Sequence, residues 1–209
     1  MNCDNLNIRS TAEPPQLGED GRTMTGYAVV YGVESQILFE RGSRFVEIID
    51  REAITPELLA VSDVKALFNH GHDHLLARSV NGAGSLTLTP DERGLRFSFL
   101  LPDTTLGHDV AELVKRGDLR GCSFAFWAAR EDIECSVRAD GMKVCRVKKI
   151  SRLVDVSVVV DPAYTQTSVE VRSLVEQQPD EQRSAPPAED QKTLSVAAAK
   201  RKITLLFNL

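Results

Sequence analysis

The segment 121–127 is the feature that most constrains the fold, because its residues alternate between two kinds along its length. Side chains of a β-strand point to opposite faces in turn, so Cys122, Phe124 and Phe126 fall on one face. We expect this bulky face to lie in the core. The other face places Ser123 between two very small neighbours. A substrate backbone is therefore expected to approach the Ser123 hydroxyl without a steric clash.

Most of the central chain also has strand patterns, either clean alternation or a high content of β-branched residues. A turn over residues 90–94 separates two alternating segments, which is typical of a hairpin. Thr55 before Pro56, and Thr104 further on, are suitable helix N-caps. We predict a mostly β fold with flanking helices, of the α+β class. The expected strands are 26–32, 45–49, 64–70, 85–89, 95–100, 120–127, 142–150 and 153–160, and the expected helices are 55–59 and 104–116.

The chain of 209 residues is long enough for one domain with a sizeable core plus tails. Residues 1–23 are polar and contain Pro14 and Pro15, so we expect a flexible N-terminal arm. The folded domain is expected over residues 24–172. Residues 173–209 are expected to form a disordered linker and a C-terminal tail, because Glu, Gln, Asp, Pro and Ser dominate much of this segment.

Charge and composition exclude some classes of partner. The formal net charge of −5 argues against a nucleic-acid partner. No apolar run reaches the roughly 18–20 residues that span a bilayer, so no membrane partner is expected. The N-terminus lacks the basic and apolar regions of a secretory signal. The four cysteines show no C-x-x-C spacing, and we expect free thiols in a reducing, intracellular setting.

Three residues on expected strands or strand ends have complementary chemistry. Ser123 needs a base before it becomes a nucleophile. His70 ends an apolar strand, where its imidazole can face a site. Asp155 interrupts a run of valines, and a buried carboxylate must find a charged or hydrogen-bonding partner. Together the three supply a nucleophile, a base and an orienting acid.

Each of these residues also has a simpler interpretation. A serine between small residues is often structural, a single histidine is more often a loop-end or core residue, and Asp155 can form an ion pair with Arg152. His70, His72 and His74 alternate, so a strand would direct all three imidazoles to one side, as in a zinc site. Cys122 is a rival nucleophile, although the alternation of the strand places it in the core.

Several motifs follow one another in an order that resembles a known family. Leu67-Phe68-Asn69-His70 resembles a strand that ends in a catalytic histidine. Gly121-Cys122-Ser123-Phe124-Ala125-Phe126 resembles a nucleophile motif, and Leu153-Val154-Asp155-Val156-Ser157 resembles a strand that carries an acidic residue. With residues 26–32 and 94–97, these motifs resemble the prohead (capsid-maturation) serine proteases of tailed bacteriophages. That family looks distantly related to the herpesvirus assemblins.

The resemblance implies a herpesvirus-protease-like β-barrel and a serine endopeptidase that needs no metal or organic cofactor. It implies Ser123, His70 and Asp155 as catalytic residues, although Asp155 stands where the family usually has glutamate and Ala125 where it usually has glycine. The implied substrates are the scaffold protein, or the scaffold-like arm of the major capsid protein, and the protease itself. The implied location is the assembling procapsid in the host cytoplasm, with a homo-oligomer among the possible states.

Three further hypotheses accompany the resemblance. A non-enzymatic capsid assembly or scaffold protein is the alternative function, since an inactive homologue would have a similar sequence. The polar linker is expected to be accessible to proteolysis, so self-cleavage is predicted between about residues 172 and 199. Residues 192–209 combine a basic cluster with apolar residues and are predicted to aid incorporation into procapsids.

Overall fold

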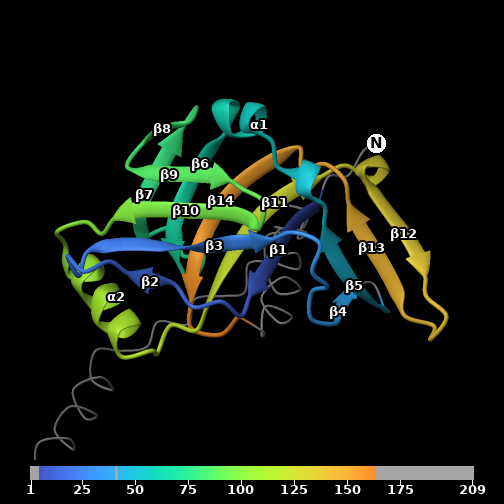
Figure 1. The fold of residues 1–209 in the computed structure, drawn as a ribbon, viewed down its shortest axis with the longest axis horizontal. Helices are drawn as coiled ribbons and strands as arrows, with labels where there is room; N and C mark the ends of the chain where they lie inside the picture. The colour runs from blue at the N-terminus through green and yellow to red at the C-terminus, as the bar shows by residue number, and fades with distance from the viewer. Residues whose placement is uncertain (1–4, 41, 163–209) are drawn as a thin grey trace, which may run out of the picture. The chain divides into compact units, whose positions relative to one another are not determined.

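The computed structural model describes residues 5–40 and 42–162, and in these residues most of the regular structure belongs to three sheets (Figure 1). We call them sheets A, B and C. In strand order, sheet A consists of β1 (Asn5–Thr11), β11 (Gly121–Ala128), β14 (Arg152–Val159), β6 (Asp63–Phe68), β7 (Leu75–Val80) and β8 (Ala83–Gly84). Sheet B consists of β2 (Gln16–Leu17), β3 (Thr23–Val30), β10 (Gly94–Leu100) and β9 (Leu86–Pro90). Sheet C consists of β12 (Ile133–Val137), β13 (Lys143–Val147), β5 (Ser43–Ile49) and β4 (Leu38–Glu40).

The prediction of a mostly β fold is confirmed, and the barrel is not. In the described residues each sheet begins and ends on different strands, so none of them closes on itself. Pairing is antiparallel except for β14 with β6 and β13 with β5. These two parallel contacts join distant parts of the chain, and the first of them brings the end of β6 beside β14.

Both predicted helices are present, together with two short 3-10 turns, Arg51–Ala53 and Arg130–Asp132. Helix α1 (Pro56–Val61) begins after Thr55, whose side chain accepts a hydrogen bond from the Leu58 N–H group. Helix α2 (Thr105–Lys115) begins after Thr104, whose side chain accepts one from Gly107. The N-cap predictions are therefore confirmed. Helix α2 and the β12–β13 hairpin lie at opposite ends of this folded part (Figure 1).

The core lies where the bulky face of β11 meets sheet B. Cys122, Phe124 and Phe126 are each at most 2% exposed and share a cluster with Phe97 of β10. Gly26 of β3 allows the close approach, because a Cβ atom there would lie 2.7 Å from the Phe97 ring and 3.0 Å from the Cys122 sulfur. The alternation in residues 121–127 thus predicted the core face of β11 correctly. The opposite face, which carries Ser123, we call the outer face of sheet A.

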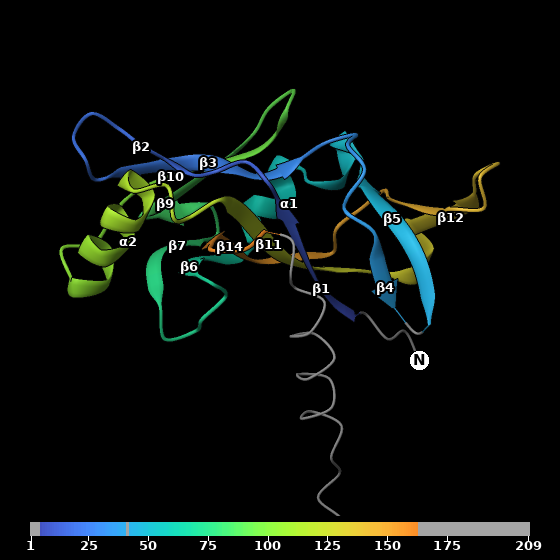
Figure 2. The same cartoon turned by 90° about the horizontal axis from the view of Figure 1, so that it is seen from below.

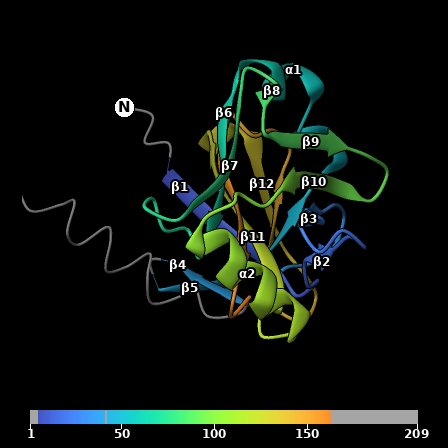
Figure 3. The ribbon, with the colours of Figure 1, turned by 90° about the vertical axis from the view of Figure 1, so that its left-hand side faces the viewer.

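The prediction of a flexible arm over residues 1–23 is wrong for the part that the structure describes. Residues 5–11 form β1, an edge strand that pairs antiparallel with β11 along its whole length (Figures 2 and 3). Leu6 and Ile8 alternate with polar residues, and Ile8 is 7% exposed. Residues 5–11 are only weakly apolar, and they form a strand because the edge of β11 offers unpaired backbone N–H and C=O groups.

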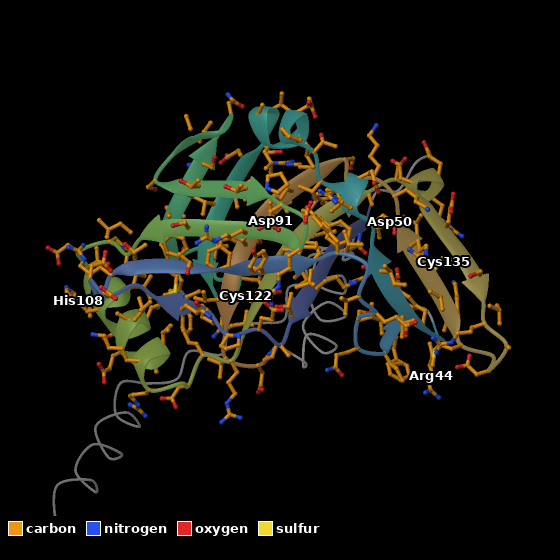
Figure 4. The ribbon with its side chains drawn as sticks, viewed as in Figure 1. Arg44, Asp50, Asp91, His108, Cys122 and Cys135 are labelled. Carbon is orange, nitrogen blue, oxygen red and sulfur yellow. A yellow bond between two sulfur atoms is a disulfide. The ribbon has the colours of Figure 1, made fainter. Side chains whose placement is uncertain are left out.

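The expectation of free thiols is wrong for two of the four cysteines. Cys135 of β12 and Cys145 of β13 form a disulfide across a register pair of the hairpin. Cys122 is a free, buried thiol. Figure 4 shows Cys122 well apart from Cys135 on the hairpin. Strands β12 and β13 thus form a cross-linked hairpin.

The part of the chain that the structure describes contains no helix long and apolar enough to cross a membrane. The predicted tail at 173–209, with its proposed cleavage and docking roles, lies outside the described residues.

Candidate active site

Ser123 lies in the middle of β11, on the outer face of sheet A, and none of its surface is exposed. Its register partners are Ser10 of β1 on one side and Ser157 of β14 on the other. Partners in an antiparallel pair direct their side chains to the same face. Three hydroxyl groups therefore form a row across the sheet, with Ser123 at its centre.

His70 lies two residues past the end of β6, in a turn and not in the strand itself. Asn69 and His70 have φ angles of 51° and 54°, in the left-handed region that few residues other than glycine adopt. The turn is held against β14: the Asn69 N–H group donates to the Val158 carbonyl at 3.0 Å, and the Val160 N–H group donates to Asn69 Oδ1 at 3.1 Å. Strained backbone held by such contacts often positions a functional side chain.

The turn brings the imidazole of His70 between Ser123 and Asp155. His70 Nε2 lies 2.6 Å from Ser123 Oγ, and His70 Nδ1 lies 2.7 Å from Asp155 Oδ1. His70 is 8% exposed and Asp155 is 4% exposed. The three residues predicted from the sequence are thus in direct contact, although 53 and 85 positions separate His70 from its two partners.

Ser157 was not predicted to belong to the site. Its hydroxyl donates to Asp155 Oδ1 at 2.9 Å, and its oxygen lies 3.2 Å from His70 Nδ1. Ser157 is 1% exposed, so this bond orients the carboxylate in a region from which water is excluded. Residues two apart on a strand share a face, and this rule applied to Asp155 would have indicated Ser157.

The three histidines do not gather on one side. His72 and His74 are exposed in the loop between β6 and β7, whereas His70 is buried. The ring of His74 packs instead near Phe68, with ring centroids 6.0 Å apart. In residues 5–40 and 42–162, no group of three or more His, Cys, Asp or Glu side chains is arranged to hold a metal ion. The geometry therefore does not support the zinc interpretation.

Cys122 does not have the properties of a nucleophile. It faces the core, where it is 0% exposed, and burial raises the pKa of its thiol to about 12. The thiolate is the reactive form of cysteine, and so high a pKa leaves almost none of it near neutral pH.

The outer face of sheet A is covered at Ser123, because β1 lies against this residue. The Ser123 hydroxyl donates to the Arg9 carbonyl at 2.8 Å, and the Ser10 hydroxyl donates to Ser123 Oγ at 3.0 Å. A Cβ atom on Gly121 would lie 2.4 Å from the Thr11 carbonyl oxygen, so the glycine allows β1 to approach this closely. Small residues beside the serine do permit a peptide backbone to come near, and the chain's own N-terminal strand takes that place.

A carboxylate, an imidazole and a hydroxyl hydrogen-bonded in this order can activate the hydroxyl oxygen. The carboxylate holds the imidazole with its free nitrogen toward the hydroxyl, and that nitrogen can accept the hydroxyl proton during an attack. Asp155 Oδ1 lies 2.7 Å from His70 Nδ1. An aspartate is therefore long enough here, although its side chain is one methylene shorter than that of the glutamate expected from the resemblance. Ala125 is 1% exposed and lies between Ile8 of β1 and Asp155 of β14 in the sheet register.

Comparison with known proteins places these features in a family. The sequence pattern of the family described as "Caudovirus prohead serine protease" matches residues 5–181. Among solved structures, the chain is similar to the bacteriophage T4 capsid assembly protease gp21, with a TM-score of 0.43 and 13% sequence identity. That match covers 76% of this chain and 98% of the other. No curated protein sequence matches the chain at a significant level.

The family match begins at the first residue of β1 and includes every strand of the three sheets. It covers most of the chain and contains the serine, the histidine and the acid whose contacts are given above. The prediction of a phage capsid-maturation serine protease is confirmed, and the non-enzymatic alternative is left without support. The chain belongs to the caudovirus prohead serine protease family.

Proposed function

We propose that Ser123, His70 and Asp155 are the catalytic triad of this protease. The observation that supports this most strongly is the pair of short contacts on the two nitrogens of one imidazole, 2.6 Å to Ser123 Oγ and 2.7 Å to Asp155 Oδ1. A structural histidine in contact with a carboxylate has no need of a serine at its second nitrogen. Ser123 is the nucleophile, His70 the general base and acid, and Asp155 the orienting acid.

The proposed reaction has two halves. Ser123 Oγ adds to the carbonyl carbon of the scissile peptide bond while its proton passes to His70 Nε2. The C–N bond then breaks, His70 returns the proton to the leaving amine, and an acyl ester remains on Ser123. Water attacks this ester while its proton passes to His70 Nε2, and the same proton then returns to Ser123 Oγ as the carboxylic acid leaves.

Asp155 keeps the reacting tautomer of His70. Asp155 Oδ1 accepts a hydrogen bond from the His70 Nδ1–H group, so the lone pair of His70 Nε2 faces Ser123 Oγ. When His70 carries two protons, the buried carboxylate stabilises the cation. Ser157 donates to the same Oδ1 atom and so limits rotation of the carboxylate.

We infer that the substrates are the scaffold protein or the scaffold-like arm of the major capsid protein, cleaved inside the assembling procapsid in the host cell. The support for this inference is membership of the prohead protease family. We also infer that the protease domain begins with β1, since the family match starts at residue 5. A distant relation to the herpesvirus assemblins is proposed on the resemblance of the prohead protease family to those proteases.

The test is co-expression of the full chain with the major capsid protein of the same phage, followed by gel analysis and mass spectrometry. The wild type is expected to shorten the capsid protein at one defined bond. Ser123→Ala and His70→Ala are expected to leave it intact, with a loss of rate of about 10⁴-fold or more for either change. His72→Ala is the matched control, because it removes an exposed imidazole from the same loop.

Circular dichroism and thermal unfolding would show that each variant is folded. Equal cleavage by wild type and by folded Ser123→Ala would refute the assignment of the nucleophile. Loss of activity in His72→Ala as well as His70→Ala, with inhibition by chelators, would instead favour the zinc interpretation.

A further inference from the structure

The N-terminal strand β1 lies directly against Ser123. It is an extended peptide at the edge of sheet A, paired antiparallel with the strand that carries Ser123. Many proteins bind extended peptides in this way, as an added strand at a sheet edge. The carbonyl oxygen of Arg9 accepts a hydrogen bond from Ser123 Oγ at 2.8 Å. In a bound substrate, the residue whose carbonyl meets the nucleophile is the one that supplies the acyl group.

The side chain of that same residue has a dedicated partner. Arg9 Nε donates to Glu47 Oε1 at 2.7 Å, and Arg9 Nη2 donates to Glu47 Oε2 at 3.0 Å. This two-point geometry matches the guanidinium fork to the two carboxylate oxygens, and lysine cannot reproduce it. Glu47 is therefore positioned to recognise an arginine.

Glu47 is buried and has no part in the proposed triad. It lies on β5 of sheet C with 4% of its surface exposed, whereas its partner Arg9 is 15% exposed at the side chain. The β5 backbone is held at this point by Ser35, whose hydroxyl accepts from the Glu47 N–H group at 2.9 Å. A buried carboxylate without a cation is costly, so the site gains much from any arginine that enters it.

We propose that β1 occupies the substrate-binding strand position on β11, and that Glu47 selects substrates with arginine on the acyl side of the scissile bond. The inference deepens the proposed function and rests on it. The substrate class is an extended peptide segment with an arginine whose carbonyl meets Ser123.

The contacts of β1 also hold the protease in a resting state. The Ser123 hydroxyl has one hydrogen, and two acceptors lie near it, His70 Nε2 at 2.6 Å and the Arg9 carbonyl at 2.8 Å. While β1 is in place, its carbonyl competes with His70 for that hydrogen, and the strand blocks other peptides. A substrate reaches Ser123 by displacing β1 from the edge of β11.

Charge reversal at Arg9 is the variant that opens the site without touching the triad. In the full chain, Arg9→Glu places two carboxylates together where an ion pair stood, so β1 should leave its position. Cleavage of a test peptide is expected to rise about tenfold or more, because like charges in a buried contact strongly oppose binding. Arg78→Glu is the matched control, since it reverses the arginine of another two-point pair, with Asp63.

The test peptide has the sequence Asn5–Glu13 of this chain, in one form with arginine and in another with glutamine at the position of Arg9. Cleavage is measured with the full-length Arg9→Glu chain, and binding with the Ser123→Ala, Arg9→Glu chain by fluorescence anisotropy. The arginine peptide is expected to bind about 30-fold more tightly than the glutamine peptide, which corresponds to removing one partner of a buried charge pair. Adding Glu47→Gln should abolish this preference.

A charge-exchange variant tests whether the single substitutions act only by disturbing the fold. The variant with both Arg9→Glu and Glu47→Arg restores the ion pair in reverse and should keep the fold. It should prefer a peptide with glutamate at the tested position over the arginine peptide. A preference that stays with arginine in this variant would overturn the role of Glu47.

The outcomes separate this inference from the proposed function. Arginine-dependent binding of the peptide, together with a capsid protein that the wild type leaves intact, would support the binding site and contradict the triad. Cleavage of the capsid protein with equal binding of the two peptides would leave the triad standing and overturn the selection by Glu47. Unchanged peptide cleavage in folded Arg9→Glu, relative to wild type, would show that β1 does not occupy the substrate position.

Discussion

The two strands that flank β11 differ in how they are held. On one side, β14 is buried along most of its length: Leu153, Val156 and Val158 are at most 2% exposed and belong to the core. On the other side, β1 is an edge strand in which Ile8 is the one buried residue between Leu6 and Thr11. β1 contacts the Ser123 hydroxyl directly, whereas the polar side chains of β14 contact His70.

The difference separates permanent parts of the site from replaceable ones. β14 supplies Asp155 and Ser157, and moving it would expose the core. β1 supplies a carbonyl and a hydroxyl that a substrate peptide could equally supply. Edge strands with few buried contacts open at low free-energy cost, whereas central strands open only with global unfolding. We therefore expect changes on the β14 side to affect catalysis and stability, and changes on β1 to affect access.

The largest effect is expected on the β14 side of this comparison, from Asp155→Asn. An amide at this position can donate to His70 Nδ1 and so hold the imidazole in the wrong tautomer. We expect kcat to fall about 10⁴-fold while KM changes little. Steady-state kinetics on a peptide from the capsid cleavage site would measure both, and an unchanged kcat would remove Asp155 from the triad.

A matched pair of leucine truncations tests the difference in burial. Leu153→Ala on β14 removes a fully buried side chain and is expected to lower the free energy of unfolding by about 2–5 kcal/mol. Leu6→Ala on β1, where the residue is 36% exposed, is expected to cost less than about 1 kcal/mol. Urea unfolding of the two variants gives the comparison directly. Similar losses would mean that β1 is as firmly held as β14, against the idea of a replaceable strand.

A smaller effect is expected from Ser157→Ala. The variant loses the hydrogen bond to Asp155 Oδ1, and hydrogen bonds to charged groups contribute about 1.5–3 kcal/mol. We expect kcat to fall about tenfold with KM nearly unchanged, since the carboxylate remains but is less well oriented. Ser157→Thr keeps the hydroxyl and should restore most of the rate. Ser79→Ala, at another buried serine of sheet A, is the control for a general packing effect.

Local patterns in the sequence predicted most of the fold. The alternation of 121–127 identified the core face of β11, and Thr55 and Thr104 marked two helix starts that the structure confirms. The assembly of strands into three open sheets depends on contacts between distant segments, such as the parallel pairing of β14 with β6. Such pairings leave no signal in a single sequence, and the barrel was an expectation from family resemblance.

The site was predictable in part for a chemical reason. Asp155 within a run of valines and Ser123 between small residues each break the local pattern, so they were visible without a structure. Contact between them and His70 was not visible, because a turn with positive φ angles sets the direction of the imidazole. The pairing of β1 was missed because Pro14 and Pro15 suggested disorder, although Leu6 and Ile8 already alternate.

The cross-linked hairpin had a signal that was overlooked. Cys135 and Cys145 lie at equal distances in sequence on either side of Asp140, and the turn there makes them register partners. Symmetric placement about a turn brings two residues opposite each other on antiparallel strands. C-x-x-C spacing is a different pattern and does not contain this relation.

In the proposed site, His70 activates Ser123 and β1 covers it. Labelling with a fluorophosphonate, in which a serine oxygen displaces fluoride from phosphorus, tests both parts when the adduct is located by peptide mass spectrometry. We predict an adduct on Ser123 in the wild type, labelling about tenfold faster or more in Arg9→Glu, and no adduct in His70→Ala. An adduct on another residue, or equal labelling rates in wild type and His70→Ala, would contradict the proposed roles of Ser123 and His70.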